Sequence, residues 1–126
     1  MSAPATPVVL VVDDDLDFLD TMTHQLGVRG FRVLTAPDSE SAMTVCEQEG
    51  DAIDVLIADL SLPGDLNGSL ARRVSAAYPT VKIVYATGVP RHIAVATGLV
   101  PPTAPYLEKP VSADILSGLM RSLIRR

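Results

Sequence analysis

The feature that most constrains the fold is a short apolar run that ends at an acidic residue and a turn. Residues 55–58 read Val-Leu-Ile-Ala, Asp59 follows directly, and Pro63-Gly64 comes soon after. A continuous apolar run of this length indicates a strand buried on both faces of a parallel sheet. Asp59 would then stand at the carboxyl end of that strand, where open α/β sheets bind their ligands. Taken alone, Asp59 fits a strand cap as well as a functional carboxylate.

Further strand-like segments alternate with helical patterns along the chain. The expected strands are residues 8–12, 32–36, 55–58, 81–86 and 105–108. A short helix is expected from Pro90 through Thr97, and Ser112 is expected to cap a last helix. The expected buried face of that last helix comprises Ile115, Leu116, Leu119 and Leu123. The alternation predicts a doubly wound parallel sheet with right-handed crossovers and helices on both faces.

The overall composition limits the class of protein and its partners. The chain has 126 residues, which predicts one domain: a lead-in over 1–7 and a folded unit over 8–126. A net charge of -5 argues against nucleic acid or an anionic membrane as a partner. The single cysteine, Cys46, cannot form an internal disulfide, which favours a cytoplasmic protein, and we expect it in the core. His24 and His92 are the only histidines, which argues against a histidine-based metal site.

Polar and charged residues follow four of the five expected strands. They are Asp13, Asp14, Asp59, Thr87 and Lys109. If these strand ends meet at one edge of the sheet, the carboxylates come close together. Two carboxylates repel each other by about 4 kcal/mol at 4 Å and an intermediate dielectric, so a cation must neutralise them. Mg²⁺ suits a few carboxylates with a backbone carbonyl and water. Lys109 and the Thr87 hydroxyl can bind phosphoryl oxygens, and Asp59 can act as the nucleophile. This combination indicates phosphoryl transfer to Asp59.

Four motifs at these strand ends resemble one known family. They are Leu-Val-Val-Asp-Asp at 10–14, Leu-Ile-Ala-Asp-Leu-Ser-Leu-Pro-Gly at 56–64, Ile-Val-Tyr-Ala-Thr-Gly at 83–88 and Tyr-Leu-Glu-Lys-Pro at 106–110. In this order and spacing they resemble a response-regulator receiver domain of two-component signalling, from Val8 to the end. The resemblance implies a flavodoxin-like (βα)5 fold with strand order 2-1-3-4-5.

The resemblance also implies a role for each matched residue in the acidic pocket. Asp59 would be the phosphoacceptor. Asp13 and Asp14 would hold Mg²⁺ together with Asp59, and Ser61 would lend its backbone carbonyl to the ion.

Three further matched residues would sense and transmit the phosphoryl group. Thr87 would be the switch hydroxyl and Lys109 the phosphate-binding lysine. Tyr106 would be the switch aromatic, whose rotamer follows Thr87 and which turns inward on phosphorylation. Plain strand packing is the alternative for Tyr106.

The family also implies partners and a mode of action. The phosphoryl donor would be a histidine kinase or a phosphotransfer protein, and the output partner is unknown. The chain would be a switch that phosphorylates and dephosphorylates itself rather than an enzyme that turns over an external substrate. An apolar docking face with Ala94, Val95, Val100 and Tyr106 would leave a homodimer open. The loop 63–68 is about one residue longer than usual, which resembles the receivers of hybrid kinases.

Two other readings of the same residues remain as alternatives. A receiver-like protein-interaction module would bind partners without phosphorylation. A haloacid-dehalogenase-like phosphatase also uses a nucleophilic Asp, but it needs a second acid where Ser61 stands.

Outside the motifs, we expect Asp15 to start a helix, Asp54 to be a solvated strand start, and Asp65 to be a turn residue.

Overall fold

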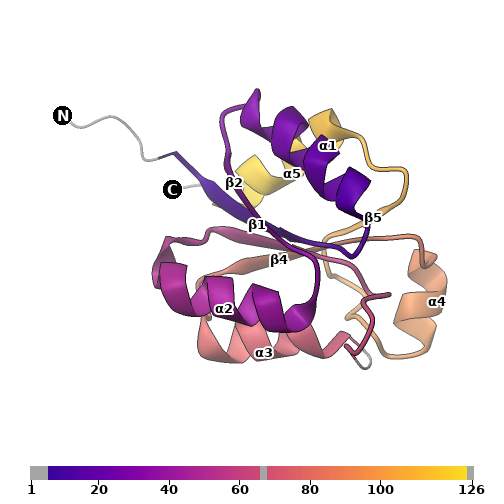
Figure 1. Cartoon of the computed structure of the whole chain (residues 1–126). Coiled ribbons are helices and arrows are strands. Elements are labelled where there is room, and N and C mark those ends of the chain that lie inside the picture. Colours follow the sequence, from indigo (N-terminus) through magenta and orange to yellow (C-terminus); the bar gives the residue numbers. More distant parts are fainter. Residues whose placement is uncertain (1–5, 66–67, 125–126) are drawn as a thin grey trace.

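Five strands and five helices alternate along the chain in the computed structural model, which describes residues 6–65 and 68–124 (Figure 1). The strands are β1 Val8–Val12, β2 Arg32–Ala36, β3 Val55–Ala58, β4 Lys82–Thr87 and β5 Tyr106–Glu108. The helices are α1 Leu16–Gly27, α2 Ser39–Glu49, α3 Ser69–Ala77, α4 Arg91–Ala96 and α5 Ala113–Ile124, and a 3₁₀ turn, Gly50–Ala52, follows α2. Most of the predicted lead-in, residues 1–5, lies outside the described residues. The alternation predicted from the sequence is confirmed.

The five strands form one parallel sheet in the predicted order β2-β1-β3-β4-β5. Its register decides which strand ends meet. Val12, the last residue of β1, pairs with Ala58, the last residue of β3. The residues that follow them, Asp13 and Asp59, are therefore neighbours at the same edge. The lengths and register of the apolar strands β1 and β3 thus bring two carboxylates together.

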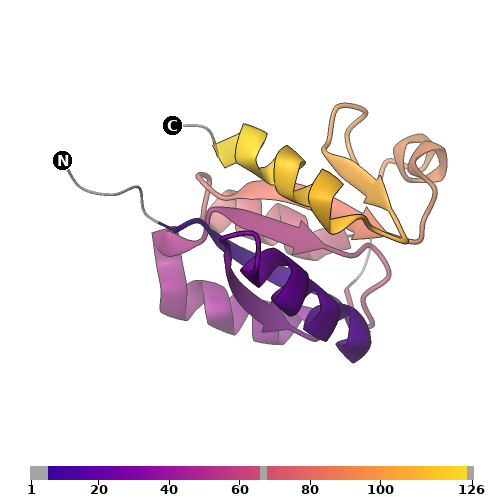
Figure 2. The ribbon, with the colours of Figure 1, turned by 90° about the horizontal axis from the view of Figure 1, so that it is seen from above.

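Helices cover both faces of the sheet, with α1 and α5 on one side and α2 and α3 on the other (Figures 1 and 2). Alternate residues of β1 point to the two layers. Val9 and Val11 pack in the cluster formed with α1 and α5, whereas Leu10 and Val12 pack in the cluster formed with α2 and α3. Burial on both faces explains why β1 and β3 are continuous apolar runs. Cys46 lies in the second of these clusters, as expected.

A third and smaller apolar cluster fills the space beside β4 and β5, under α4. Its buried members are Leu60, Ala71, Tyr85, Ala94, Val100 and Tyr106. The helix α4 begins at Arg91, with Pro90 as its N-cap residue, so it starts one residue later than predicted. This cluster connects the loop after β3 to the region around Tyr106.

Side-chain caps fix where two of the helices start. The Asp15 carboxylate accepts hydrogen bonds from the N–H groups of Asp17 and Phe18, at 3.0 and 3.2 Å. The Ser112 hydroxyl accepts one from the N–H of Ile115 at 3.3 Å. Such caps satisfy N–H groups that have no partner inside the helix. Asp15 and Ser112 therefore have the predicted positions.

The buried face of α5 differs from the prediction at Ile115 and Met120. Ile115 is 62% exposed, whereas the neighbouring Leu116 is fully buried and Met120 takes the next core position. Leu116 and Met120 are four residues apart and share one helix face, while Ile115 lies one residue outside that stripe. Leu119 and Leu123 pack only at its margin.

Asp54 is also different from its expected role. Its Oδ2 atom accepts a hydrogen bond of 2.8 Å from the N–H of Val8, so it ties β3 to the start of β1. A solvated strand start is therefore the wrong description. The partner is 46 residues away in the sequence, which local patterns do not reveal.

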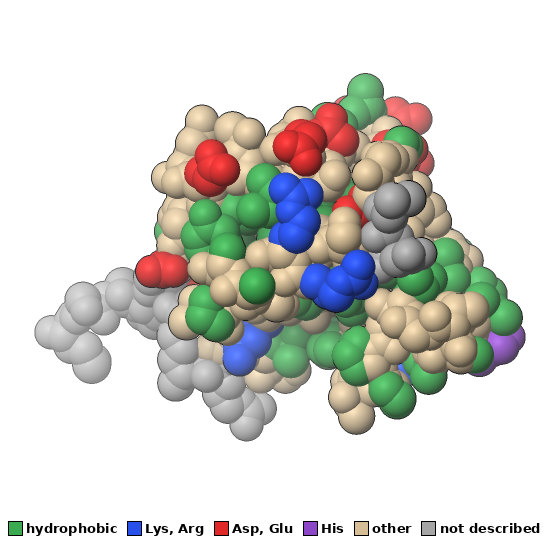
Figure 3. Space-filling model, turned by 90° about the horizontal axis from the view of Figure 1, so that it is seen from below, with side chains coloured by type: hydrophobic (Ala, Val, Ile, Leu, Met, Phe, Trp, Pro, Cys, Tyr) green, Lys and Arg blue, Asp and Glu red, His purple; other side chains and the backbone are tan. Residues whose placement is uncertain are grey.

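The outer face of α2 and α3 carries both acidic and basic side chains (Figure 3). One ion pair crosses between these helices, from Arg73 Nη1 to Glu40 Oε1 at 3.6 Å. Both side chains are largely exposed, and such pairs contribute little to stability. Within the described part of the chain, no helix is long and apolar enough to span a membrane.

The corrected face of α5 yields a test with two adjacent residues. We expect Leu116→Ala to lower the free energy of unfolding by about 2–5 kcal/mol, because it leaves a cavity in a packed core. Ile115→Ala should change it by less than about 0.5 kcal/mol, because that side chain is exposed. Urea unfolding followed by circular dichroism measures both. Equal losses in the two variants would contradict the assignment of the buried face.

Candidate functional site

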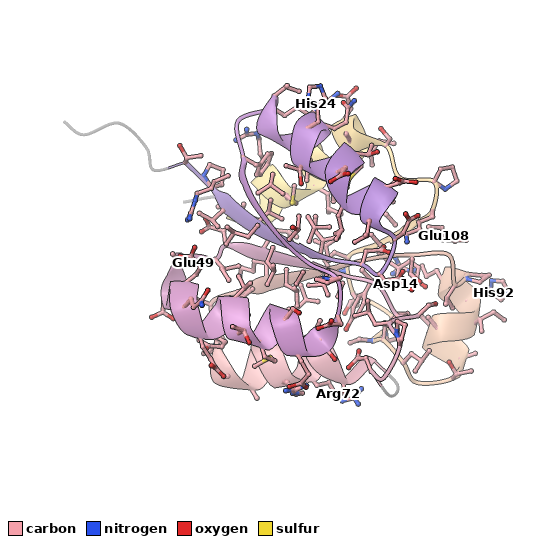
Figure 4. The ribbon with its side chains drawn as sticks, in the orientation of Figure 1. Asp14, His24, Glu49, Arg72, His92 and Glu108 are labelled. Carbon is pink, nitrogen blue, oxygen red and sulfur yellow. The ribbon has the colours of Figure 1, made fainter. Side chains whose placement is uncertain are left out.

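The candidate site lies at the carboxyl edge of the sheet, where the loops after β1, β3, β4 and β5 meet. Figure 4 shows Asp14, after β1, and Glu108, the last residue of β5, at this same edge. The backbone N–H of Lys109 donates to the carbonyl of Thr87 at 2.9 Å, which holds the end of β5 against the end of β4. Parallel pairing therefore gathers the polar residues that the sequence places after separate strands.

A single ammonium group bridges two buried carboxylates at the centre of the site. Lys109 Nζ lies 2.5 Å from Asp13 Oδ2 and 3.1 Å from Asp59 Oδ2. Asp13 is only 1% exposed and Asp59 only 5%, so water screens these charges weakly. The bridge explains how two acids persist side by side in the folded chain.

The environment of Asp59 favours its ionised form. Burial pushes its pKa upward, but hydrogen bonds from the Thr87 hydroxyl, the Ser61 N–H and Lys109 outweigh burial and hold the pKa below its ordinary value. The Ser61 bond reaches Asp59 Oδ1 at 3.0 Å. Asp59 therefore presents an anionic carboxylate at neutral pH, which is the form that can act as a nucleophile.

The pKa values of Asp13 and Lys109 are also set by a competition between burial and pairing with opposite charges. For Asp13, burial dominates and raises the pKa, although Lys109 and the N–H of Asp15 oppose it. For Lys109, burial lowers the pKa, but its bonds to Asp13 and Asp59 outweigh burial and raise it. Lys109 therefore stays protonated at neutral pH, as a permanent positive charge beside Asp59.

The three acids of the pocket are close enough to share one small cation. Asp13, Asp14 and Asp59 each offer a carboxylate oxygen, and these atoms lie within 4.8 Å of one another. Oxygens on opposite sides of one Mg²⁺ lie roughly 4.2 Å apart, so only a small closure is needed. Asp14 is exposed, which leaves room for bound water. The donor set fits a magnesium site.

A line of hydrogen bonds leads from Thr87 to Tyr106. Thr87 is fully buried, and its hydroxyl accepts a bond of 3.3 Å from the N–H of Val89. The Tyr106 hydroxyl donates to the carbonyl of Val89 at 2.5 Å. Tyr106 is buried and already points inward in this structure. Val89 thus connects the hydroxyl beside Asp59 to the predicted switch aromatic.

Two residues at the site have contacts that the sequence did not indicate. Asp65, expected as a turn residue, is buried, and its Oδ1 accepts bonds from the Ser69 hydroxyl at 2.6 Å and the Leu70 N–H at 3.0 Å. It fastens the loop after β3 to the start of α3, while Leu66 and Asn67 of that loop lie outside the described residues. Phe18, in the first turn of α1, places its ring beside Lys109, with Nζ 4.5 Å from the ring centroid.

The bridging role of Lys109 can be measured in buffer without divalent cations. We expect Lys109→Met to lower the free energy of unfolding by about 1–3 kcal/mol, because it leaves Asp13 and Asp59 buried without a cation. Lys82→Met is the matched control, since Lys82 is exposed at the start of β4 and away from the pocket. A loss no larger for Lys109→Met than for Lys82→Met would contradict the bridge.

Comparisons with known proteins place the chain in one family. The sequence model of the response regulator receiver domain matches residues 9–121. Transcriptional regulatory protein AruR of Pseudomonas aeruginosa is 32% identical over 123 residues, 95% of this chain and 50% of that protein. Sensory transduction protein RegX3 of Mycolicibacterium smegmatis is 30% identical over 118 residues, 94% of this chain and 50% of that protein. The chain spans about half the length of these curated relatives.

Solved structures agree with the sequence comparison. A response regulator receiver domain protein of Clostridium thermocellum superposes with a TM-score of 0.84 at 27% identity, over 95% of both chains. A response regulator of Thermotoga maritima has a TM-score of 0.80 at 26% identity, over 97% of this chain and 100% of that one. The pocket of Asp13, Asp14 and Asp59, with Lys109, is consistent with a phosphoacceptor. The chain belongs to the response regulator receiver domain family, whose members are signalling switch domains rather than turnover enzymes.

Proposed function

We propose that Asp59 accepts a phosphoryl group from a phosphohistidine of a histidine kinase or a phosphotransfer protein. One observation carries the proposal: Asp59 is a nearly buried carboxylate held in its ionised form, with Lys109 Nζ 3.1 Å from its Oδ2. A nucleophile and a permanent cation are thus adjacent at a strand end. Thr87 adds a hydroxyl donor on the same carboxylate.

The transfer itself needs little more than these groups. An oxygen of the Asp59 carboxylate forms a bond to phosphorus while the phosphorus–nitrogen bond of the donor breaks, and the electron pair returns to the imidazole nitrogen. Lys109 and Thr87 are placed to donate hydrogen bonds to phosphoryl oxygens as charge accumulates there. The product is an aspartyl phosphate with up to about two negative charges in place of one carboxylate charge.

Magnesium completes the proposed site. Asp13, Asp14 and Asp59 would hold Mg²⁺, together with the backbone carbonyl of Ser61, which follows from the family rather than from a measured contact. When bound, Mg²⁺ supplies positive charge for the oxygens of the transferred group. The strands beneath these carboxylates, β1 and β3, are fully apolar and buried.

The proposed output is a shift of the region around Tyr106. Thr87 would follow the new phosphoryl oxygens, and Val89 would pass this movement to Tyr106 through the two hydrogen bonds described above. Such coupling is typically worth about 1–3 kcal/mol, which shifts populations without rebuilding the fold. The output partner would then bind the face formed by α4, β5 and α5. A homodimer through this face is one form that such an output could take.

The proposed setting is the cytoplasm, which is supported by the single, unpaired and buried Cys46. Neither nucleic acid nor membrane is proposed as a direct partner of this domain, because its net charge is -5. The second candidate function is a protein-interaction module that works without phosphorylation.

Phosphorylation is tested by the intact mass of the protein after incubation with Mg²⁺ and acetyl phosphate. We expect a gain of one phosphoryl group, which is lost in Asp59→Asn and when a chelator removes Mg²⁺. Asp51→Asn is the control, because this exposed acid follows α2 at the opposite edge of the sheet. No gain in a folded protein that binds Mg²⁺ would favour the phosphorylation-independent module instead.

Magnesium binding is tested by titration calorimetry with two neighbouring acids. Asp14→Asn should weaken Mg²⁺ binding about 10-fold or more, because it removes a charged ligand. Asp15→Asn should bind nearly as well as the unmodified protein, because Asp15 caps α1 and Asn is an equally good cap. If Asp15→Asn weakened binding as much as Asp14→Asn, the assigned ligands would be wrong.

A further inference from the structure

The ring of Phe18 contacts the ammonium group that holds the site together. Lys109 Nζ lies over this ring, 4.5 Å from its centroid. Phe18 belongs to the first turn of α1, whereas Lys109 follows β5, so the contact joins segments far apart in the sequence. The face of an aromatic ring attracts a cation at this distance. The ammonium thus has three neighbours: Asp13, Asp59 and the ring.

The ring of Phe18 and the side chain of Lys109 also line one surface pocket. A pocket of about 280 Å³ between α1 and the loop after β5 is lined by Phe18 and Lys109, but not by Asp13 or Asp59. The two carboxylates are nearly buried, whereas the ring is only partly buried. Lys109 itself keeps a side-chain exposure of 26%.

The backbone fixes the position of the ring relative to the acids. Asp13 Oδ1 accepts a bond of 2.9 Å from the N–H of Asp15, and Asp15 Oδ1 accepts one of 3.2 Å from the N–H of Phe18. Two hydrogen bonds therefore connect the carboxylate that pairs with Lys109 to the residue that carries the ring. The ring and the carboxylate are set at fixed places around one flexible side chain.

We infer that Phe18 is a positioning residue that holds the Lys109 ammonium beside Asp59 for phosphoryl transfer. This inference rests on the proposed function. A lysine has a flexible four-carbon stem and loses much rotamer freedom when it is held. An ion pair is directional in its geometry, but the ring face accepts the ammonium over a range of positions. The ammonium can therefore turn from Asp13 toward an incoming phosphoryl oxygen and still keep its contact with the ring.

The other explanation is that Phe18 only fills space between α1 and α5, where it is partly buried in the apolar cluster. The chain offers a matched control for that explanation, since its second phenylalanine, Phe31, belongs to the same cluster. Phe31 also carries a cation over its ring, with Arg121 Cζ 4.6 Å from the centroid. It precedes β2 and so lies at the amino edge of the sheet, away from Asp59.

The experiment measures the rate at which acetyl phosphate phosphorylates the full chain at saturating Mg²⁺. We expect Phe18→Leu, which keeps apolar volume but has no ring, to react about 2- to 30-fold more slowly. Phe18→Tyr, which restores a ring, should regain most of the rate. Phe31→Leu should react at the unmodified rate, even where it lowers the stability more. A small donor is used so that contacts with a kinase play no part.

A second readout needs neither Mg²⁺ nor a phosphoryl group. Protons above an aromatic ring face are shielded, so the ε-methylene protons of Lys109 should resonate upfield of those of Lys82 in divalent-free buffer. That shift should disappear in Phe18→Leu and persist in Phe31→Leu. The shift reports the contact between ring and ammonium, and the rate reports what that contact does: a purely space-filling role for Phe18 would leave the rate of Phe18→Leu unchanged.

The inference is overturned if Phe18→Leu reacts at the unmodified rate, if Phe31→Leu slows the reaction equally, or if Phe18→Tyr fails to restore it. If the unmodified protein takes no phosphoryl group at all, the proposed function fails instead. In that case the proton shift of Lys109 still decides whether Phe18 holds the ammonium, because an unshifted signal in the unmodified protein contradicts the contact.

Discussion

The ion pairs from Lys109 to Asp13 and Asp59 are the interactions on which the site depends. Two nearly buried carboxylates cannot remain ionised side by side without a nearby positive charge, because weak screening makes their repulsion large. The Lys109 ammonium supplies that charge at 2.5 and 3.1 Å. The pocket is therefore balanced by one flexible side chain, and any ligand that adds or removes charge there changes the balance.

The sheet makes this arrangement possible before any side chain takes part. Because Val12 pairs with Ala58, the residues after β1 and β3 must meet, and the β4–β5 pairing brings Lys109 to the same edge. The strands, buried on both faces, form a rigid scaffold, and the functional residues lie on the loops at its carboxyl edge. The third apolar cluster packs Tyr85 of β4 and Tyr106 of β5 together with Ala94 of α4.

Much of this was predictable from the sequence, and the failures share a physical cause. The short apolar runs predicted the strands, and the resemblance to receiver domains implied their order. The polar residues after the strands predicted a shared site, which comprises Asp13, Asp14, Asp59, Thr87 and Lys109. Asp54 was misjudged, and the side-chain contacts of Asp65 and Phe18 were not foreseen, because their partners are hydrogen-bond donors or a cation brought by tertiary contacts, which periodicity does not encode. Ile115 was misjudged because the width of the apolar stripe on α5 is decided by what packs against it. The roles of Ser61, Thr87 and Tyr106 in signalling stay predictions.

The most direct test of the account is a crystal structure of the protein with Mg²⁺ and beryllofluoride, which mimics a phosphoryl group. The account predicts beryllofluoride on Asp59, hydrogen bonds to it from Lys109 and Thr87, and Mg²⁺ on Asp13, Asp14 and Asp59. Beryllofluoride bound elsewhere, or Lys109 still paired with Asp13 while Asp59 carries the mimic, would contradict the central role given to this lysine.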